Sequence, residues 1–323
     1  MWIFVITATI LVILFLSGPR PRLDPTAPET RVPSSANPRE LGEWLDDQEK
    51  SVGGLIDGAE ACIEWANPDT PDRTPLCFMY VHGFSATRQE TAPVTERIAA
   101  HFGANVLYLR IAGHGVGPEG MLTATEDWLQ SMVDGWSIAS RLGDRVVLIA
   151  TSTGAPLSIW LASQYGIREK LHAMLFMSPN FRIMNRYDFL LTWPWSRYWL
   201  QWIIGKTHSW EAVNEEHAKY WSNHYSTLAL IEMQKMVNWV RHQDLSRFEV
   251  PLALMYMEND PVVDSRYAVR AFHEWGAKRK RLIPVEPDGE AAEHVFVGRI
   301  TAPHRIDWCS DQFIEFLDTL NKG

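Results

Sequence analysis

The chain has 323 residues, enough for one large α/β domain with a sizeable core. Its 30 lysines and arginines are outnumbered by 39 acidic residues, so the net charge of -9 excludes the basic composition typical of nucleic-acid-binding proteins. The three cysteines, Cys62, Cys77 and Cys309, lack the spacing of a metal site, and their odd number argues against a disulfide framework. We therefore expect no metal, no nucleic acid partner and a reducing compartment.

Residues 1–17 are almost wholly apolar and predict a short transmembrane helix, roughly 25 Å long. The run lacks the basic start and the small-x-small cleavage site of a signal peptide. Arg20 and Arg22 follow it, so the positive-inside rule places the rest of the chain in the cytoplasm. The sequence thus predicts a single-pass signal anchor in a cell inner membrane, with a buried core helix as the alternative.

Residues 18–39 contain six prolines among polar residues, a composition typical of a stiff linker that does not pack. We expect the folded domain to occupy residues 40–323. Within it, apolar runs of strand length alternate with helical patterns, which predicts a doubly wound, mostly parallel sheet that binds ligands at the carboxyl ends of its strands. The predicted parallel strands are 76–81, 105–109, 146–150, 173–177, 252–257 and 281–285.

An insertion at about 181–245 interrupts this alternation and carries seven of the 15 tryptophans. An insertion of this length at the ligand side of a sheet predicts a helical lid. Large aromatic side chains can form the wall of an apolar pocket, so we expect Trp195 and Trp199 to bind substrate. The alternative is that the tryptophans form a small core of their own.

A candidate nucleophile, Ser152, lies between the strand 146–150 and a helical pattern. The small residues Ala150 and Gly154 flank it at two positions on either side, as a sharp strand-to-helix turn requires. Such a turn presents the serine Oγ at the carboxyl end of the strand. Ala150 replaces the first glycine of the strict G-x-S-x-G pattern, and the simpler alternative is that Ser152 caps the following helix.

A nucleophilic serine needs a base, and the base needs an acid to orient it. Asp260 directly follows a predicted strand, whereas Asp264 begins the next helix, where capping explains it. His294 follows the last strand by a loop of suitable length, whereas His304 has the position of a surface residue before the terminal helix. We therefore expect Asp260 and His294 to act with Ser152.

An oxyanion hole needs two preorganised N–H donors. One is expected from the backbone amide of Thr153, at the start of the helix after the nucleophile. The other is expected from the loop after His82 and Gly83, with the Phe84 amide preferred over that of Ser85.

These motifs together resemble those of the α/β-hydrolase superfamily, and within it the lysophospholipase and monoacylglycerol-lipase-like serine hydrolases. The resemblance extends from residue 76 to the C-terminus. It implies an α/β-hydrolase fold and ester hydrolysis through an acyl-enzyme without a cofactor, with Ser152 as nucleophile, His294 as base and Asp260 as orienting acid. The motifs that carry it are His82-Gly83-Phe84, Gly113-His114-Gly115, the Ser152 turn, Asp260 with Val263, and His294-Val295.

The leading interpretation is a membrane-tethered serine esterase or lipase that acts on small apolar acyl esters, including lipids. A peptidase or amidase of the same fold is one alternative, in which Glu211, Glu215 or Glu216 would hold a substrate amine. An acyltransferase would use the same three residues and exclude water. A non-catalytic, membrane-tethered binding module is the alternative from a different class.

Overall fold

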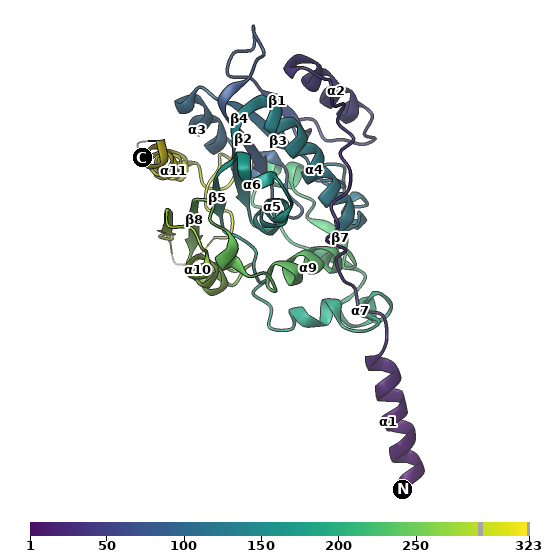
Figure 1. Cartoon of the computed structure of the whole chain (residues 1–323). Helices are drawn as coiled ribbons and strands as arrows, with labels where there is room; N and C mark the ends of the chain where they lie inside the picture. The colour runs from purple at the N-terminus through teal and green to yellow at the C-terminus, as the bar shows by residue number, and fades with distance from the viewer. Residues whose placement is uncertain (290–292, 322–323) are drawn as a thin grey trace.

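The central sheet of the computed structural model has seven strands in the order β1-β3-β2-β4-β5-β8-β9. β1 pairs antiparallel with β3, and the other neighbours pair in parallel. The structure describes residues 1–289 and 293–321. This sheet confirms the predicted α/β-hydrolase class (Figure 1). The strands are β1 (Cys62–Glu64), β2 (Thr74–Val81), β3 (Asn105–Leu109), β4 (Gly143–Thr151), β5 (Leu171–Met177), β8 (Leu252–Met257) and β9 (Lys280–Val285).

Helices cover both faces of the sheet, which explains why its inner strands are unbroken apolar runs. In β2, Met79 packs into the core under α4 and α5, whereas Tyr80 packs into the core under α3 and α11. This alternation is the two-residue period of a strand. The covering helices are α2 (Pro38–Lys50), α3 (Val94–Phe102), α4 (Thr125–Leu142), α5 (Gly154–Ser163), α6 (Ile167–Lys170), α10 (Ser265–Glu274) and α11 (Ile306–Asn321).

The insertion between β5 and β8 is mainly helical, as the sequence indicates. Its last helix is part of the main core, because Met236 and Val237 are fully buried beside α5. Its function as a lid stays a prediction. The insertion contains η3 (Asp188–Thr192), α7 (Ser196–Ile204), the β6 (Thr207–Ser209) and β7 (His224–Ser226) hairpin, α8 (Glu215–Tyr220) and α9 (Ala229–Val240).

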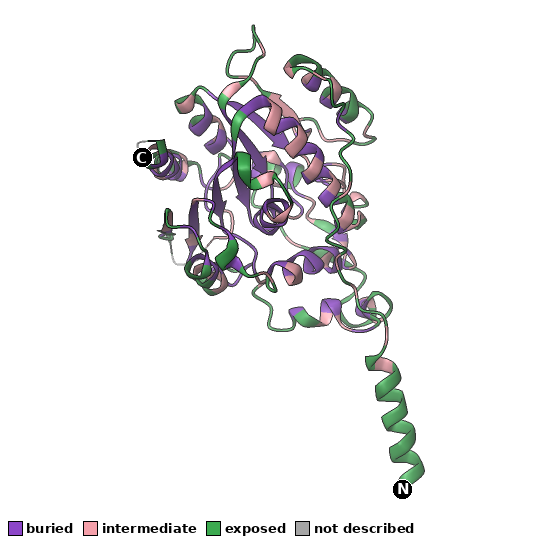
Figure 2. Cartoon of the chain, in the orientation of Figure 1, coloured by how far each residue is buried: buried purple, intermediate pink, exposed green. Residues whose placement is uncertain are grey.

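The predicted membrane anchor is wrong. The N-terminal apolar run forms α1 (Trp2–Leu16), whose 15 residues extend roughly 22 Å, less than the ~30 Å of a hydrocarbon core. Among residues 1–289 and 293–321, no helix has the length and apolar character needed to span a membrane. The predicted inner-membrane location, with a cytoplasmic catalytic domain, depended on that span and is therefore wrong as well. α1 projects from the body of the molecule, and its residues are exposed apart from Phe15 (Figures 1 and 2).

The proline-rich segment after α1 packs against the domain, contrary to the expectation that it stays free. It runs beside α4 and α5 toward α2 (Figure 1), and Val32 is only 4% exposed within the main core. The Trp160 indole donates a hydrogen bond to the carbonyl of Pro25 at 3.0 Å, and Arg31 pairs with Asp134 at 2.7 Å. Prolines lack an N–H but keep their carbonyl groups, so side-chain donors can still hold an extended segment in place.

Candidate active site

Ser152 lies in a strained turn between β4 and α5. Its φ of 50° is in the left-handed region, which a non-glycine residue rarely adopts and which is often found at functional sites. The turn is held by its own backbone, because the Ser152 amide donates to Met177 and its carbonyl accepts from Asn180. Gly154 is required here, since a Cβ at this position would lie 2.2 Å from the carbonyl oxygen of Val81. The local backbone is therefore the sharp strand-to-helix turn that the sequence predicts, and the role of Ser152 as nucleophile stays a prediction.

Three of the predicted residues meet at the carboxyl ends of the strands. His294 Nε2 lies 2.9 Å from Ser152 Oγ, and His294 Nδ1 lies 2.8 Å from Asp260 Oδ2. Asp260 is 1% exposed, and its Oδ1 accepts the backbone N–H groups of Val262 and Val263. When Nδ1–H donates to the carboxylate, Nε2 is left as the acceptor for the serine proton. This arrangement can therefore perform nucleophilic acyl transfer.

The two alternative residues have other partners. Asp264 accepts the backbone N–H of Arg266 at the start of α10. It also forms an ion pair with the Arg266 side chain at 2.8 Å. It is a helix cap, as its sequence position indicates. His304 contacts Asp288, with both side chains more than half exposed.

The hydrogen bonds of Gly83 fix the orientation of the Phe84 amide. The Gly83 carbonyl accepts hydrogen bonds from His82 Nδ1 at 2.9 Å and from the Ala86 amide at 3.3 Å. Because a trans peptide sets its C=O and N–H antiparallel, the Phe84 amide points the opposite way. Across the described part of the chain, the amides of Phe84, Ser85 and Thr153 donate no hydrogen bond. They are available as oxyanion donors, which is the role predicted for Phe84 and Thr153.

His82 behind this loop is held in one tautomer. Its Nε2 accepts the backbone N–H of Ile111 at 3.0 Å, so the proton resides on Nδ1, which donates to Gly83. Burial, together with the neighbouring His114, holds the pKa of His82 well below its usual range. A permanently neutral imidazole suits a structural role in the turn.

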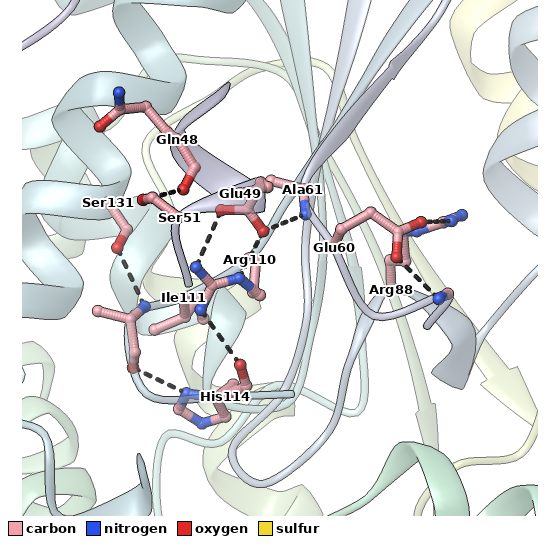
Figure 3. Close-up of polar contacts among 12 residues, drawn as sticks. Gln48, Glu49, Ser51, Glu60, Ala61, Arg88, Arg110, Ile111, His114 and Ser131 are labelled. Atoms are coloured by element: carbon pink, nitrogen blue, oxygen red, sulfur yellow. Dashed lines mark hydrogen bonds and ion pairs between the residues drawn. The ribbon is translucent and has the colours of Figure 1, made fainter. Parts of the chain in front are cut away.

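The loop that supplies the Ile111 amide is anchored to α2 by a largely buried ion pair. Arg110 Nε and Nη2 donate to the two carboxylate oxygens of Glu49 at 2.6 and 2.9 Å, and Nη1 donates to the His114 carbonyl at 3.3 Å (Figure 3). The Ser131 hydroxyl of α4 accepts a hydrogen bond from the Ala112 amide at 3.1 Å. Charge-assisted bidentate bonds of this kind fix geometry well. α2 and α4 thus support His82, and through it residues 83–86, which are called the oxyanion loop here after the role predicted for Phe84.

Sequence reasoning missed a buried carboxyl group at this loop. Glu90, in η1 (Arg88–Glu90), is 1% exposed, and its Oε1 accepts the Gly83 amide at 2.6 Å and the Tyr80 hydroxyl at 2.8 Å. Burial raises the pKa of Glu90 to about 7, while hydrogen bonds from Gly83 and Tyr80 and the charge of His294 lower it. The sequence around Glu90 carries no signal that distinguishes it from a solvated glutamate.

The two tryptophans predicted to bind substrate contact residues other than Ser152, His294 and Asp260. Trp195 is 39% exposed, and its indole donates to the carbonyl of Phe15 in α1. Trp199 donates to the Pro194 carbonyl and packs within the insertion. Their substrate-binding role stays a prediction that these contacts do not support.

Other aromatic residues of the insertion lie beside the site. Tyr220 and Trp221 form a cluster with Ala86 of the oxyanion loop and with Val295, which directly follows His294. The Ser222 amide also donates to the Ser85 carbonyl at 2.7 Å, which ties the insertion to the oxyanion loop. Sequence spacing within an irregular insertion does not reveal which tryptophans point toward a site.

Comparisons with known proteins agree with this architecture. The profile of the family described as serine aminopeptidase, S33, matches residues 75–286. A thermostable monoacylglycerol lipase of Bacillus sp. (strain H-257) is 29% identical over 104 residues, which cover 32% of this chain and 41% of that relative. The chain thus matches less than half the length of this curated relative.

Solved structures of lipolytic enzymes share the fold. A structure from work on the metagenome-derived lipolytic enzymes LipS and LipT has a TM-score of 0.64 at 18% identity, covering 82% of this chain and 99% of that one. The monoacylglycerol lipase of Paleococcus ferrophilus has a TM-score of 0.58 at 17% identity, covering 81% of this chain and 99% of that one. At such identities the likeness shows the fold alone. The chain belongs to the serine aminopeptidase S33 family and is an α/β-hydrolase that resembles lipases and esterases.

Proposed function

We propose that this protein is a serine hydrolase that cleaves carboxylic esters of apolar acyl groups through an acyl-enzyme on Ser152. The observation that carries the proposal is the hydrogen-bonded series from Ser152 Oγ through His294 to Asp260, with distances of 2.9 and 2.8 Å. A serine hydroxyl attacks an ester only when a base takes its proton, and the buried carboxylate stabilises the imidazolium that forms.

The reaction proceeds in two halves. Ser152 Oγ attacks the ester carbonyl as His294 Nε2 takes its proton, and the Phe84 and Thr153 amides bind the tetrahedral oxyanion. The intermediate collapses with transfer of that proton from His294 to the leaving alcohol. Water then attacks the acyl-enzyme with His294 again as base, and the carboxylic acid leaves as Ser152 recovers its proton.

An apolar acyl group is favoured by the aromatic residues beside the site and by the likeness to a monoacylglycerol lipase. Burial of each methylene contributes roughly 0.8 kcal/mol, so two further methylenes should raise kcat/KM roughly tenfold where a pocket receives them. We expect kcat/KM to rise from acetyl to octanoyl esters. Trp221→Ala should flatten this series, and the matched change Trp195→Ala should leave it unaltered, because Trp195 contacts α1 instead.

An aminopeptidase, the activity in the family's description, is the second candidate. It would need a carboxylate to bind the substrate's free amine. The three glutamates considered for this role are exposed: Glu216 pairs with Arg299 at 3.5 Å, and Glu211 and Glu215 lie on the surface. We therefore rank ester hydrolysis ahead of peptide hydrolysis.

The test combines a covalent probe with a substrate panel. A fluorophosphonate should label the wild type and not Ser152→Ala, and that variant should lose about a millionfold in kcat, as expected for a nucleophile acting within a triad. A panel of p-nitrophenyl esters beside aminoacyl amides then decides between the two candidates. Wild-type protein that resists the probe, or Ser152→Ala that keeps more than a few per cent of its activity, would refute the proposed nucleophile.

A further inference from the structure

The carboxyl group of Glu90 occupies the space between the oxyanion loop and the nucleophile turn. A Cβ built on Gly83 would lie 3.1 Å from Glu90 Oε2 and also 3.1 Å from Ser152 Cβ. The Glu90 carboxyl group and Ser152 thus border the same small volume, in which a side chain at position 83 would be tightly packed. The two-step mechanism proposed above gives no role to this buried carboxyl group.

The hydrogen bonds of Glu90 join the two halves of the site. The Tyr80 hydroxyl donates to Oε1 at 2.8 Å and accepts from Thr91 Oγ1 at 2.8 Å. The same hydroxyl lies 3.1 Å from Oγ1 of Thr151, the residue directly before the nucleophile. Since the Tyr80 proton goes to Glu90, Thr151 is the donor in this contact. The network therefore runs from the Gly83 amide through Glu90 and Tyr80 to β4.

Gly83 is consequently held on both sides. Glu90 Oε1 accepts its N–H at 2.6 Å, while His82 and Ala86 donate to its carbonyl group. The two peptide planes that meet at this residue are thereby fixed. The second of these planes carries the Phe84 amide. Donors for an oxyanion are effective when their direction is set before the reaction begins.

We infer that Glu90 is a positioning residue for the oxyanion hole, which acts by holding the Gly83 peptide so that the Phe84 amide points at the developing oxyanion. The inference rests on the proposed function. Both the neutral and the ionised carboxyl offer Oε1 as an acceptor, and so does the carbonyl oxygen of glutamine. Leucine, of similar size, offers none and leaves the Gly83 and Tyr80 donors unsatisfied.

Two variants and a remote control test this role. Glu90→Gln should keep kcat within a few-fold of the wild type. Glu90→Leu should lose roughly 10²-fold in kcat, the lower end of the range for a lost oxyanion donor, with KM changed only a few-fold. The control is Asn105→Leu, a buried change at the amino end of β3, on the opposite edge of the sheet, where Asn105 bonds Asp72 and Leu142. It should lower the melting temperature and leave kcat nearly intact.

The decisive readout is a transition-state mimic. A trifluoromethyl ketone that adds to Ser152 places its oxyanion in the hole, so its inhibition constant should weaken in Glu90→Leu by about the factor by which kcat falls. Should Glu90→Leu not fold, Glu90→Asp retracts the acceptor by one methylene and should shift both quantities in the same direction. Full kcat in the folded variant, an inhibition constant that does not follow kcat, or an equal loss in Asn105→Leu would overturn the inference.

The same experiment separates this inference from the function on which it rests. Wild-type protein that neither reacts with the fluorophosphonate nor hydrolyses esters would overturn the proposed function, and the inference with it. Wild-type protein that reacts, beside a Glu90→Leu variant that reacts equally fast, would overturn the inference alone.

Discussion

Replacement of Asp260 by asparagine should disable His294 as the base without disturbing the fold. Asp260 Oδ1 accepts two backbone N–H groups, from Val262 at 2.8 Å and Val263 at 3.0 Å. In Asp260→Asn only the carbonyl oxygen can take that position, because an NH₂ group cannot accept. The NH₂ group must then face His294 Nδ1, where the carboxylate oxygen Oδ2 lies at 2.8 Å in the wild type.

The change reverses the hydrogen bond to His294. The amide donates to Nδ1, so the ring proton moves to Nε2, which can no longer accept the proton of Ser152. The cost of holding a triad histidine in the wrong tautomer is about 10⁴ in kcat. At 1.36 kcal/mol for each factor of ten, this corresponds to about 5 kcal/mol of transition-state stabilisation. The free energy of unfolding should change little, since both backbone bonds remain.

The assay is kcat for a p-nitrophenyl ester, measured beside thermal unfolding of each variant. Asp264→Asn is the matched control, because Asp264 caps α10 and pairs with an exposed arginine. It should keep kcat within about twofold and change the melting temperature little, because asparagine caps a helix about as well as aspartate and only an exposed ion pair is lost. The reasoning fails if Asp260→Asn keeps more than a few per cent of wild-type kcat, or if Asp264→Asn proves the more damaging change.

Three further predictions concern stability and reactivity. Deletion of residues 1–17 should leave the melting temperature almost unchanged. Deletion of residues 1–37 should lower the free energy of unfolding by at least ~2 kcal/mol, because it removes the buried Val32. Equal melting temperatures of the two truncated proteins would contradict this prediction. Burial raises the pKa of Glu90 from its ordinary 4.5 to about 7, although the Gly83 and Tyr80 hydrogen bonds and the nearby His294 lower it. Folding thus favours the neutral carboxyl, so its contribution is complete below pH 4.5 and is lost as pH rises through about 7. The melting temperature of Glu90→Gln relative to wild type should therefore rise over that interval in calorimetry, and a constant difference would refute the reasoning. Burial also raises the pKa of the cysteine thiols, that of Cys62 to about 11, so the thiols stay protonated and unreactive at pH 8. Iodoacetamide at this pH should therefore not abolish ester hydrolysis, and rapid inactivation would contradict the prediction.

The sheet and the nucleophile turn were predictable because both depend on local patterns. The stretch of a strand that is buried on both faces is apolar, and β4 shows this in the unbroken run 146–150 shortly before Ser152. A parallel sheet brings the carboxyl ends of its strands to one edge, so the residues that follow β4 and β8 had to lie at the same edge, where only β5 separates the two strands. For His294 to lie beside these residues, the loop after the last strand needed only to be long enough to reach that edge.

The N-terminal predictions failed because composition does not determine length or contact. A run of 17 almost wholly apolar residues suggested a membrane span, but the helix ends at Leu16 and has 15 residues. The prolines after it suggested an unpacked linker, although their carbonyl groups accept hydrogen bonds from side chains far along the chain, such as Trp160. Neither the end of α1 nor those partners can be read from hydropathy.

The sequence by itself determined the class of fold, the strained turn at Ser152 and the chain order of the candidate triad, because each follows from periodicity, small residues and strand ends. The tertiary structure alone decided which side chains support the site. Glu90 becomes a buried acceptor only when β2, β4 and the oxyanion loop enclose it, and Trp221 lies nearer the site than Trp195 only through the path of an irregular insertion. Burial and long-range hydrogen bonds depend on segments far apart in the chain, and a local pattern carries no record of them.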